Sequence, residues 1–186
     1  ENEIVGAPTG IMDQTASLFG ELDQAVFIDC RSLEATPVPL GFADAGLELL
    51  IIDTKVAHRL VDGGYAARRA ACESGAATLG VKSLRDLNVS DLPRAEELLD
   101  DLTMRRVRHV VTESARVEKT VETLQAEGPR AIGDLLYASH ESMRDDFEIS
   151  IDELDTAVET ALRHGAIGAR MTGGGFGGAA IALTPI

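Results

Sequence analysis

Five glycines fall within six positions near the C-terminal end of the chain, in the run Gly173–Gly178. The stretches on either side, Ile167–Met171 and Ala179–Thr184, are short and apolar, which predicts two β-strands. Because their connection is too long for a two-residue hairpin turn, we expect the glycines to form an extended loop. A glycine cluster can also be a flexible hairpin tip, but the apolar residues Met171 and Phe176 favour a loop that packs against the protein.

A second glycine opens the stretch Gly10–Thr15, in which the carboxylate of Asp13 follows three residues later and a helix is expected to begin. Gly10 has no Cβ, so a ligand can approach its main chain. Asp13 falls in the first helical turn, where the positive end of the helix dipole favours an ionised carboxylate. Such a group can accept a proton or orient a hydroxyl group. The alternative interpretation is that Asp13 only stabilises the helix N-terminus.

Apolar runs predict two further strands, at Gln24–Cys30 and Leu47–Asp53. Between them, Pro37 and Pro39 cannot donate hydrogen bonds to a neighbouring strand, so any strand at Ala35–Leu40 is expected at a sheet edge. The polar, glycine-containing loop 41–46 is the best candidate for a domain boundary.

Apolar residues at three- and four-residue spacing predict helices over residues 66–79, 100–127 and 132–143, and a further helix after Ser150. Ser150 and Glu153 have the spacing of a capping box for that last helix. The apolar face of the longest helix consists of Val107, Val110, Val111, Val117, Val121 and Leu124. Strands mixed with helices, without a repeating βαβ unit, predict an α+β fold.

The formal net charge of −14 argues against a nucleic-acid surface, because phosphate backbones attract Lys and Arg. No apolar run approaches the roughly 20 residues of a membrane helix, and no signal-peptide pattern begins at Glu1. The cysteines Cys30 and Cys72 are expected to be free buried thiols in a reducing cytosol. The four histidines lack metal-ligand spacing, so each is expected to be an ordinary surface or packed residue. These features predict a cytoplasmic protein with no nucleic-acid or membrane partner.

Two common phosphate-binding motifs are absent from the sequence. There is no Gly-x-x-x-x-Gly-Lys-Ser/Thr loop, and no Gly-x-Gly-x-x-Gly run opens a helix after a strand. A nucleophile in a strand-turn-helix elbow is also missing, so the sequence does not predict a triad of nucleophile, His and acid.

Three stretches, taken in order, resemble the galactokinases: Glu1-Asn2 with Val5-Gly6, Gly10–Gln14, and Met171–Gly178. Galactokinases belong to a larger family of small-metabolite kinases that also includes the homoserine, mevalonate and phosphomevalonate kinases. Further matching stretches are Ile28–Leu33, Tyr65 with Arg68-Arg69, Arg108–Glu113 and Ser139–Glu148. The glycine run alone would indicate only the larger family, whereas the full set is specific to galactokinases and covers nearly the whole chain.

The resemblance implies an antiparallel sheet covered by helices. Residues 46–186 would form a C-terminal kinase domain that is incomplete at its C-terminus, and residues 1–45 would form the end of an N-terminal kinase domain. The chain would then be the internal and C-terminal part of a longer protein, inactive alone, because most phosphate- and sugar-contacting residues would lie upstream of Glu1. The active site would lie between the domains, with Asp13 and the glycine loop facing one cleft.

The activity implied by the resemblance is transfer of the γ-phosphoryl group of ATP to the C1 hydroxyl of α-D-galactose. Asp13 would be the catalytic base or the carboxylate that orients the sugar hydroxyl, and Glu1 would bind Mg²⁺. Gly10 and Tyr65 would contact the sugar, although Ala66 stands where the family commonly has Asn. The loop bordering the phosphate site would comprise Gly173, Gly174 and Gly175, and we expect a side chain at Gly174 to clash there.

Two alternatives remain within this resemblance. One is a related sugar kinase that acts on N-acetylgalactosamine, and the other is a catalytically silent galactose-binding regulator of the same fold. In the preferred interpretation the protein is a monomeric ATP-dependent kinase whose binding partners are galactose and ATP.

Overall fold

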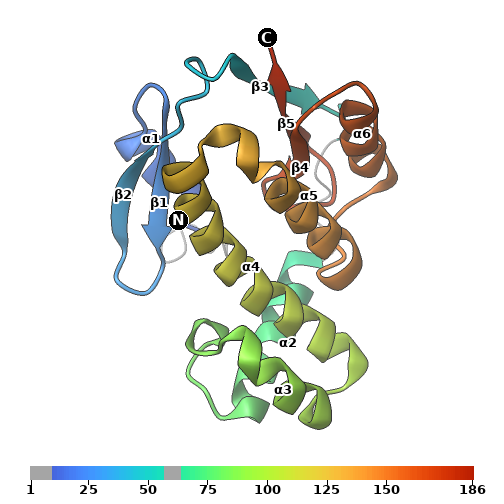
Figure 1. Ribbon diagram of the computed structural model, residues 1–186. Coiled ribbons are helices and arrows are strands. Elements are labelled where there is room, and N and C mark those ends of the chain that lie inside the picture. The colour runs from blue at the N-terminus through green and yellow to red at the C-terminus, as the bar shows by residue number, and fades with distance from the viewer. Residues whose placement is uncertain (1–9, 57–63) are drawn as a thin grey trace.

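The computed structural model describes residues 10–56 and 64–186. It combines two antiparallel sheets with helices, so the predicted α+β class is confirmed (Figure 1). The strands are β1 (Gln24–Asp29), β2 (Glu34–Pro39), β3 (Leu47–Asp53), β4 (Gly168–Thr172) and β5 (Ala179–Pro185). The α-helices are α1 (Met12–Phe19), α2 (Gly64–Leu79), α3 (Leu92–Leu98), α4 (Asp101–Glu127), α5 (Gly133–Glu141) and α6 (Asp152–Arg163). Short helical segments are η2 (Leu84–Asp86), η3 (Val89–Asp91), η4 (Pro129–Ile132) and the π-helical η5 (Ser142–Asp146).

The larger sheet has the strand order β3-β5-β4, with β5 in the centre. The pairing of β4 with β5 ends at Thr172 opposite Ala179, so the glycine run connects two neighbouring antiparallel strands, as predicted. Among the described residues, the smaller sheet is the β1–β2 hairpin, in which Gln24 lies opposite Pro39. Within residues 10–56 and 64–186 the proline-containing strand β2 therefore pairs on one side only, as expected for an edge strand.

Helices α5 and α6 pack against the larger sheet (Figure 1). Small residues on the sheet allow this close packing, since Ala169, Ala180 and Ala182 are almost fully buried beneath the helices. An ideal Cβ at Gly133, the first residue of α5, would lie only 2.2 Å from the carbonyl oxygen of Ile167. Glycine is therefore required where α5 meets β4, because any side chain would force the backbones apart.

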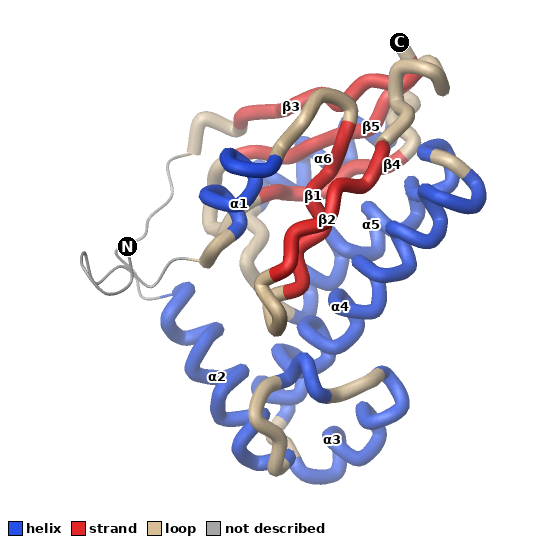
Figure 2. The backbone as a smooth tube through the Cα atoms, turned by 90° about the vertical axis from the view of Figure 1, so that its left-hand side faces the viewer, coloured by secondary structure: helices blue, strands red, loops and turns tan. Residues whose placement is uncertain are grey.

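The long helix α4 joins the two ends of the molecule (Figure 2). Its N-terminal half packs against α2 and α3, and its C-terminal half lies beside the β1–β2 hairpin. The buried side chains of the first contact are Ala76, Leu79, Leu84, Ala95, Met104, Val107 and Val111. Val117, which was predicted on the packed face, is 42% exposed and lines a cavity under the hairpin.

Two local predictions were wrong. Helix α6 has Ile151 at its N-cap without a side-chain hydrogen bond, and Ser150 donates from Oγ to Asp155 Oδ1 at 2.6 Å instead of forming the capping box. Cys30 is exposed, because strand β1 ends at Asp29 and leaves this thiol in the following turn. Cys72 is partly buried, and burial raises the pKa of its thiol.

Among the helices in the described ranges, each is too short or too polar to span a lipid bilayer.

The α6 helix offers a direct test of this packing. Leu154 is fully buried against the larger sheet, whereas Leu162 on the same helix is 50% exposed. We expect Leu154→Ala to lower the free energy of unfolding by about 2–5 kcal/mol, because it leaves a cavity in the core. The matched change Leu162→Ala should cost less than about 1 kcal/mol. Denaturant titration of both variants checks this, and equal losses would contradict the assigned packing of α6.

Candidate functional site

The glycine loop, residues Gly173–Gly178, has a backbone that only glycine adopts easily. The φ angles of Gly173, Gly175, Gly177 and Gly178 are +82°, +82°, +132° and +91°. Even Phe176, the non-glycine residue of the run, has a φ of +61°. Side chains with a Cβ disfavour this region, so the concentration of glycine follows from the path of the chain.

Main-chain hydrogen bonds attach the glycine loop to the protein on two sides. The Phe176 amide donates to the Ile149 carbonyl at 2.7 Å, and the Gly178 amide donates to the Val56 carbonyl at 3.0 Å. Thr54 returns two bonds to the Gly178 carbonyl, from its amide at 3.0 Å and from its hydroxyl at 2.6 Å. The loop is therefore packed, as the apolar residues in the sequence predicted, and is not a free hairpin tip.

The steric requirement for glycine falls at Gly175. An ideal Cβ there would lie 2.4 Å from the Ile149 carbonyl oxygen, whereas a Cβ at Gly174 meets no protein atom within 4 Å. No described protein atom would clash with a side chain at Gly174, so the expected clash at the proposed phosphate site stays a prediction. Gly173 and Gly174 are exposed at the outer edge of the loop, and Gly175 is buried at its base.

The start of α2 lies directly against this loop. An ideal Cβ at Gly64 would be 2.7 Å from Cζ of Phe176, and the guanidinium of Arg68 lies over the same ring, 5.7 Å from its centroid. Tyr65 follows Gly64 and is 44% exposed. The fold thus brings Tyr65 close to the glycine loop, although more than 100 residues separate them in the sequence.

The structure does not show the other predicted site residues, Asp13, Gly10 and Glu1, next to the glycine loop. Asp13 lies in the first turn of α1 with an exposed side chain, and Gly10 is exposed just before this helix. Helix α1 packs against β1 and β2, whereas the glycine loop belongs to the larger sheet. That Asp13 and the loop face one cleft stays a prediction. Glu1 lies outside the described residues.

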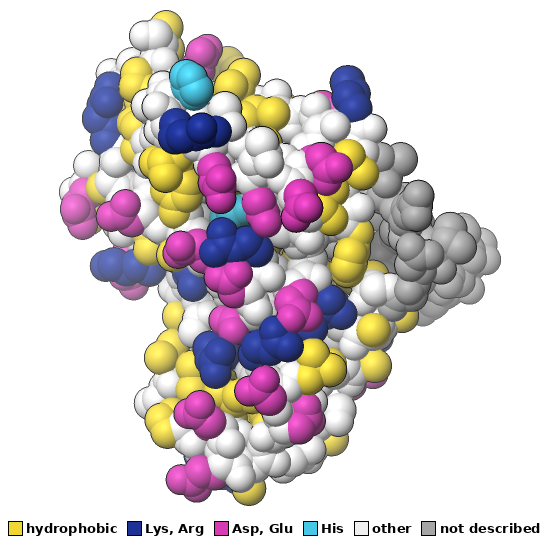
Figure 3. Space-filling view, turned by 90° about the vertical axis from the view of Figure 1, so that its right-hand side faces the viewer, with side chains coloured by type: hydrophobic (Ala, Val, Ile, Leu, Met, Phe, Trp, Pro, Cys, Tyr) yellow, Lys and Arg dark blue, Asp and Glu magenta, His cyan; other side chains and the backbone are white. Residues whose placement is uncertain are grey.

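A charged cluster, which sequence reasoning missed, surrounds the chain between η5 and α6. The Glu148 carboxylate accepts hydrogen bonds from Arg105 and Arg106, and the bond from Arg106 is the main cause that holds the pKa of Glu148 below its usual value. Arg106 is only 2% exposed, and Arg108 pairs with Asp146 at 3.0 Å. Acidic and basic side chains alternate across the face seen in Figure 3. The signal was present in the sequence as an arginine inside an apolar helical face.

Two buried histidines support the same segment. His109 stacks on Phe147 with ring centroids 4.4 Å apart, and its Nδ1 lies 2.9 Å from Oγ of Ser142. Burial lowers the pKa of His109 to about 4. His140 accepts the Met171 amide hydrogen at Nδ1, 3.3 Å away, and burial lowers its pKa as well. Both histidines are packed residues, which is one of the two placements that the sequence predicted, and their lowered pKa favours the neutral form near pH 7.

His140 also contacts Asp155 of α6. Its Nε2 lies 3.1 Å from Asp155 Oδ1, the oxygen that accepts the Ser150 hydroxyl. This row of side chains joins α5, the start of α6 and the end of β4, so the strand that enters the glycine loop is tied to both covering helices.

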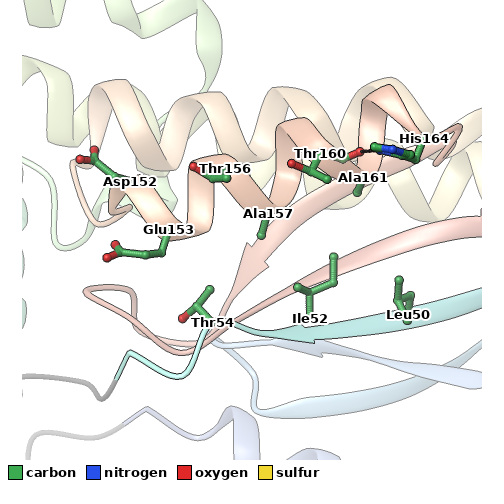
Figure 4. Close-up of a pocket in the computed structure, with 10 residues that line it drawn as sticks. All are labelled: Leu50, Ile52, Thr54, Asp152, Glu153, Thr156, Ala157, Thr160, Ala161 and His164. Atoms are coloured by element: carbon green, nitrogen blue, oxygen red, sulfur yellow. Dashed lines mark hydrogen bonds between the residues drawn. The ribbon is translucent and has the colours of Figure 1, made fainter.

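No residue of the glycine loop lines either of two cavities in the described part of the chain, although the first cavity includes Thr54, which bonds to Gly178. A groove of about 570 Å³ runs between β3 and α6 (Figure 4). Its ionisable groups are separated, with Asp152 and Glu153 at one end and His164 at the other, so it does not converge polar groups on one point. A cavity of about 190 Å³ under the β1–β2 hairpin has Glu113 and Arg170 at its polar end, paired at 3.3 Å.

The glycine loop is the better candidate for a ligand site. Successive glycine residues in left-handed and neighbouring conformations form concave main-chain surfaces that bind anions. The overall charge of −14 would repel an anionic ligand, so such a site depends on local main-chain donors and on nearby arginines such as Arg68.

Comparison with known proteins gives one family match and many similar sequences. The family model described as GHMP kinases C terminal matches residues 120–185. A galactokinase of Streptomyces coelicolor is 55% identical over 185 residues, which cover 98% of this chain and 48% of that protein. A galactokinase of Mycobacterium tuberculosis is 47% identical over 185 residues, which cover 100% of this chain and 51% of that protein. The chain spans about half the length of the curated relatives it matches.

Solved structures agree with this relationship. The crystal structure of Lactococcus lactis galactokinase complexed with galactose matches with a TM-score of 0.92 and 35% identity, covering 99% of this chain and 48% of that chain. The structure of L. major mevalonate kinase in complex with R-mevalonate matches with a TM-score of 0.56 and 22% identity, covering 94% of this chain and 43% of that chain. The second match shows a shared fold alone.

The neighbouring glycines Gly174 and Gly175 should respond differently to an added methyl group. We expect Gly175→Ala to lower the free energy of unfolding by at least about 2 kcal/mol, since it combines a positive φ with a clash against Ile149. Gly174→Ala should change it by less than about 1 kcal/mol in either direction. Thermal and denaturant unfolding of both variants test this. Similar stability of the two variants would show that the loop does not pack on Ile149 in solution.

The buried His109 should make stability depend on pH. Because its folded pKa of about 4 lies below the 6.5 of an exposed histidine, the unfolded chain binds the extra proton between these values. The free energy of unfolding is therefore unaffected by this group above pH 6.5, and it decreases as the pH falls from 6.5 towards 4. Between pH 7 and 4.5 we expect wild-type protein to lose about 2–3 kcal/mol more than His109→Gln. His164→Gln, at an exposed histidine, is the control and should keep the wild-type pH slope. Parallel slopes for wild type and His109→Gln would contradict the burial of this ring.

Proposed function

Because the chain belongs to the GHMP kinase family, we propose that its protein is a galactokinase, which transfers the γ-phosphoryl group of ATP to the C1 hydroxyl of α-D-galactose. The observation that carries this proposal is the 55% identity to a galactokinase across 98% of the chain. The TM-score of 0.92 to a galactokinase solved with galactose supports the same substrate. Residues 1–45 and 46–186 would belong to the N-terminal and C-terminal kinase domains of this enzyme.

Asp13 is the catalytic base of the proposed reaction or the carboxylate that orients the sugar. The C1 oxygen attacks the γ-phosphorus, its proton passes to the Asp13 carboxylate, and the bond to the β-phosphate oxygen breaks to release ADP. Phosphoryl transfer asks a protein mainly for positioning and charge stabilisation. The exposure of Asp13 at the start of α1 is compatible with contact to a substrate.

The remaining predicted residues bind the two substrates. Gly10 contacts the sugar through its main chain, and Tyr65 contacts it through its hydroxyl group. Gly173, Gly174 and Gly175 border the phosphates of ATP, which the open space above Gly174 supports. The proximity of Tyr65 to the loop supports a single site for sugar and nucleotide.

Mg²⁺ enters the proposal as part of the ATP complex, with Glu1 as a protein ligand. In residues 10–56 and 64–186, no group of three His, Cys, Asp or Glu side chains could hold a metal ion. No step of the proposed reaction is assigned to a metal ion. We further propose that the enzyme is cytoplasmic and monomeric.

The assay that tests this function measures ATP turnover by the full-length protein with galactose, N-acetylgalactosamine and no sugar. Turnover with galactose supports the galactokinase. Preference for N-acetylgalactosamine would show that the protein is the related kinase. Galactose binding without turnover would show that it is a catalytically silent regulator.

Asp13 is the residue to change in that assay. We expect Asp13→Ala to lower the rate of galactose phosphorylation by about 10²- to 10⁴-fold, because it removes the positioned carboxylate. Asp13→Asn, which keeps the shape of the side chain, should be similarly impaired if the carboxylate accepts the proton. The side chain lies at the surface, so both variants should unfold at the wild-type temperature. Near-normal turnover in both variants would remove Asp13 from the mechanism.

A further inference from the structure

Glu148 adopts a backbone conformation that is unusual for its residue type. Its φ is +53°, in the left-handed region that glycine and asparagine occupy far more readily than glutamate. Such strain persists only where surrounding contacts over-determine it. Glutamate at this position therefore indicates that its side chain makes contacts that hold the turn.

Those contacts come from three arginines on two helices. Arg105 and Arg106 of α4 both donate to the Glu148 carboxylate. Arg106 also donates to the Asp146 carbonyl. From α2, Arg68 donates to the carbonyl of Glu148 at 2.8 Å and to that of Phe147. The arginines thus hold the segment from Asp146 to Glu148 both by the Glu148 carboxylate and by the main-chain carbonyl groups.

This turn leads directly into the contact that positions the glycine loop. The next residue, Ile149, is buried, and its carbonyl accepts the Phe176 amide at 2.7 Å. The loop fits so closely here that no Cβ is tolerated at Gly175. Arg68 touches both sides of the contact, since it also lies over the Phe176 ring. A rotation of the Glu148 backbone would therefore move the Ile149 carbonyl and the loop with it.

We propose that Glu148 is a positioning residue for the glycine loop: Arg105 and Arg106 hold its carboxylate, and the resulting left-handed turn presents the Ile149 carbonyl to Phe176. Glu148 acts through the loop and does not touch the substrates. Its effect on ATP rests on the proposed function, whereas its effect on the loop does not.

The test compares Glu148→Gln with Glu118→Gln in the full-length protein. Glutamine keeps the size of the side chain and removes the charge that the two arginines bind. Glu118 is a matched control, because its carboxylate also pairs an arginine of another element, Arg85, at 2.8 Å, and is similarly exposed at 50% against 40% for Glu148.

Amide hydrogen exchange measures how firmly the loop is held, and it needs no activity assay. We expect the Phe176 amide to exchange at least tenfold faster in Glu148→Gln, while amides in the middle of α6 keep wild-type rates. Glu118→Gln should leave Phe176 unchanged. An unchanged Phe176 rate in folded Glu148→Gln would overturn the proposal, as would equal acceleration in the control.

Steady-state kinetics give the functional readout. We expect Glu148→Gln to raise the KM for ATP and lower kcat, each at least fivefold, with the KM for galactose within twofold of wild type. Equal changes in both KM values would overturn a specific role at the nucleotide loop. If wild-type protein does not phosphorylate galactose, the proposed function fails, and the exchange measurement still decides the role of Glu148.

Glu148→Gln leaves the buried Arg106 without its carboxylate and could prevent folding. In that case Arg105→Lys carries the test, because Arg105 is 31% exposed and lysine keeps the charge but not the planar guanidinium. Faster exchange at Phe176 in this variant supports the proposal, and wild-type exchange overturns it.

Discussion

The burial of the Arg106 guanidinium is the interaction on which the rest of the site depends. Arg106 is only 2% exposed, so its charge requires hydrogen-bonding partners. The Glu148 carboxylate and the Asp146 carbonyl provide them. Removing one partner of such a pair is strongly destabilising, because the other charge stays buried and unpaired. The pair therefore fixes the long helix against the segment after η5, and through Ile149 it fixes the position of the glycine loop.

Close backbone packing transmits that position through the rest of the larger sheet. Glycines where α5 meets β4 bring helix and strand backbones into contact, and alanines beneath α6 keep this layer thin. Closely packed interiors deform little, so the end of β4 and the base of the glycine loop cannot move independently of the helices. His140 adds a polar connection in the same place, between Met171 and Asp155.

The outer edge of the loop has the opposite character. Gly173 and Gly174 are exposed, and a Cβ at Gly174 meets no described protein atom. A firmly held base with an open rim suits a surface that receives a ligand through its main chain, since the rigid part sets the geometry and the rim leaves space. This arrangement is compatible with the proposed phosphate site at the loop, and the guanidinium of Arg68 places one positive charge beside it.

Local patterns in the sequence predicted the strands, the α-helices other than α3, the α+β class and the glycine loop, because periodicity and glycine content act over a few residues. The resemblance added the family, which is supported by relatives and a solved galactokinase that this chain matches over about half of their length. The tertiary structure alone decided that Gly175 rather than Gly174 is sterically required, and that Arg106 is buried against Glu148. In the tertiary structure Cys30 is also exposed, and the Ser150 hydroxyl bonds to Asp155 instead of capping helix α6. The reason is distance along the chain: Glu148 and Arg106 are 42 residues apart, and no local pattern encodes which charge meets which partner once helices pack.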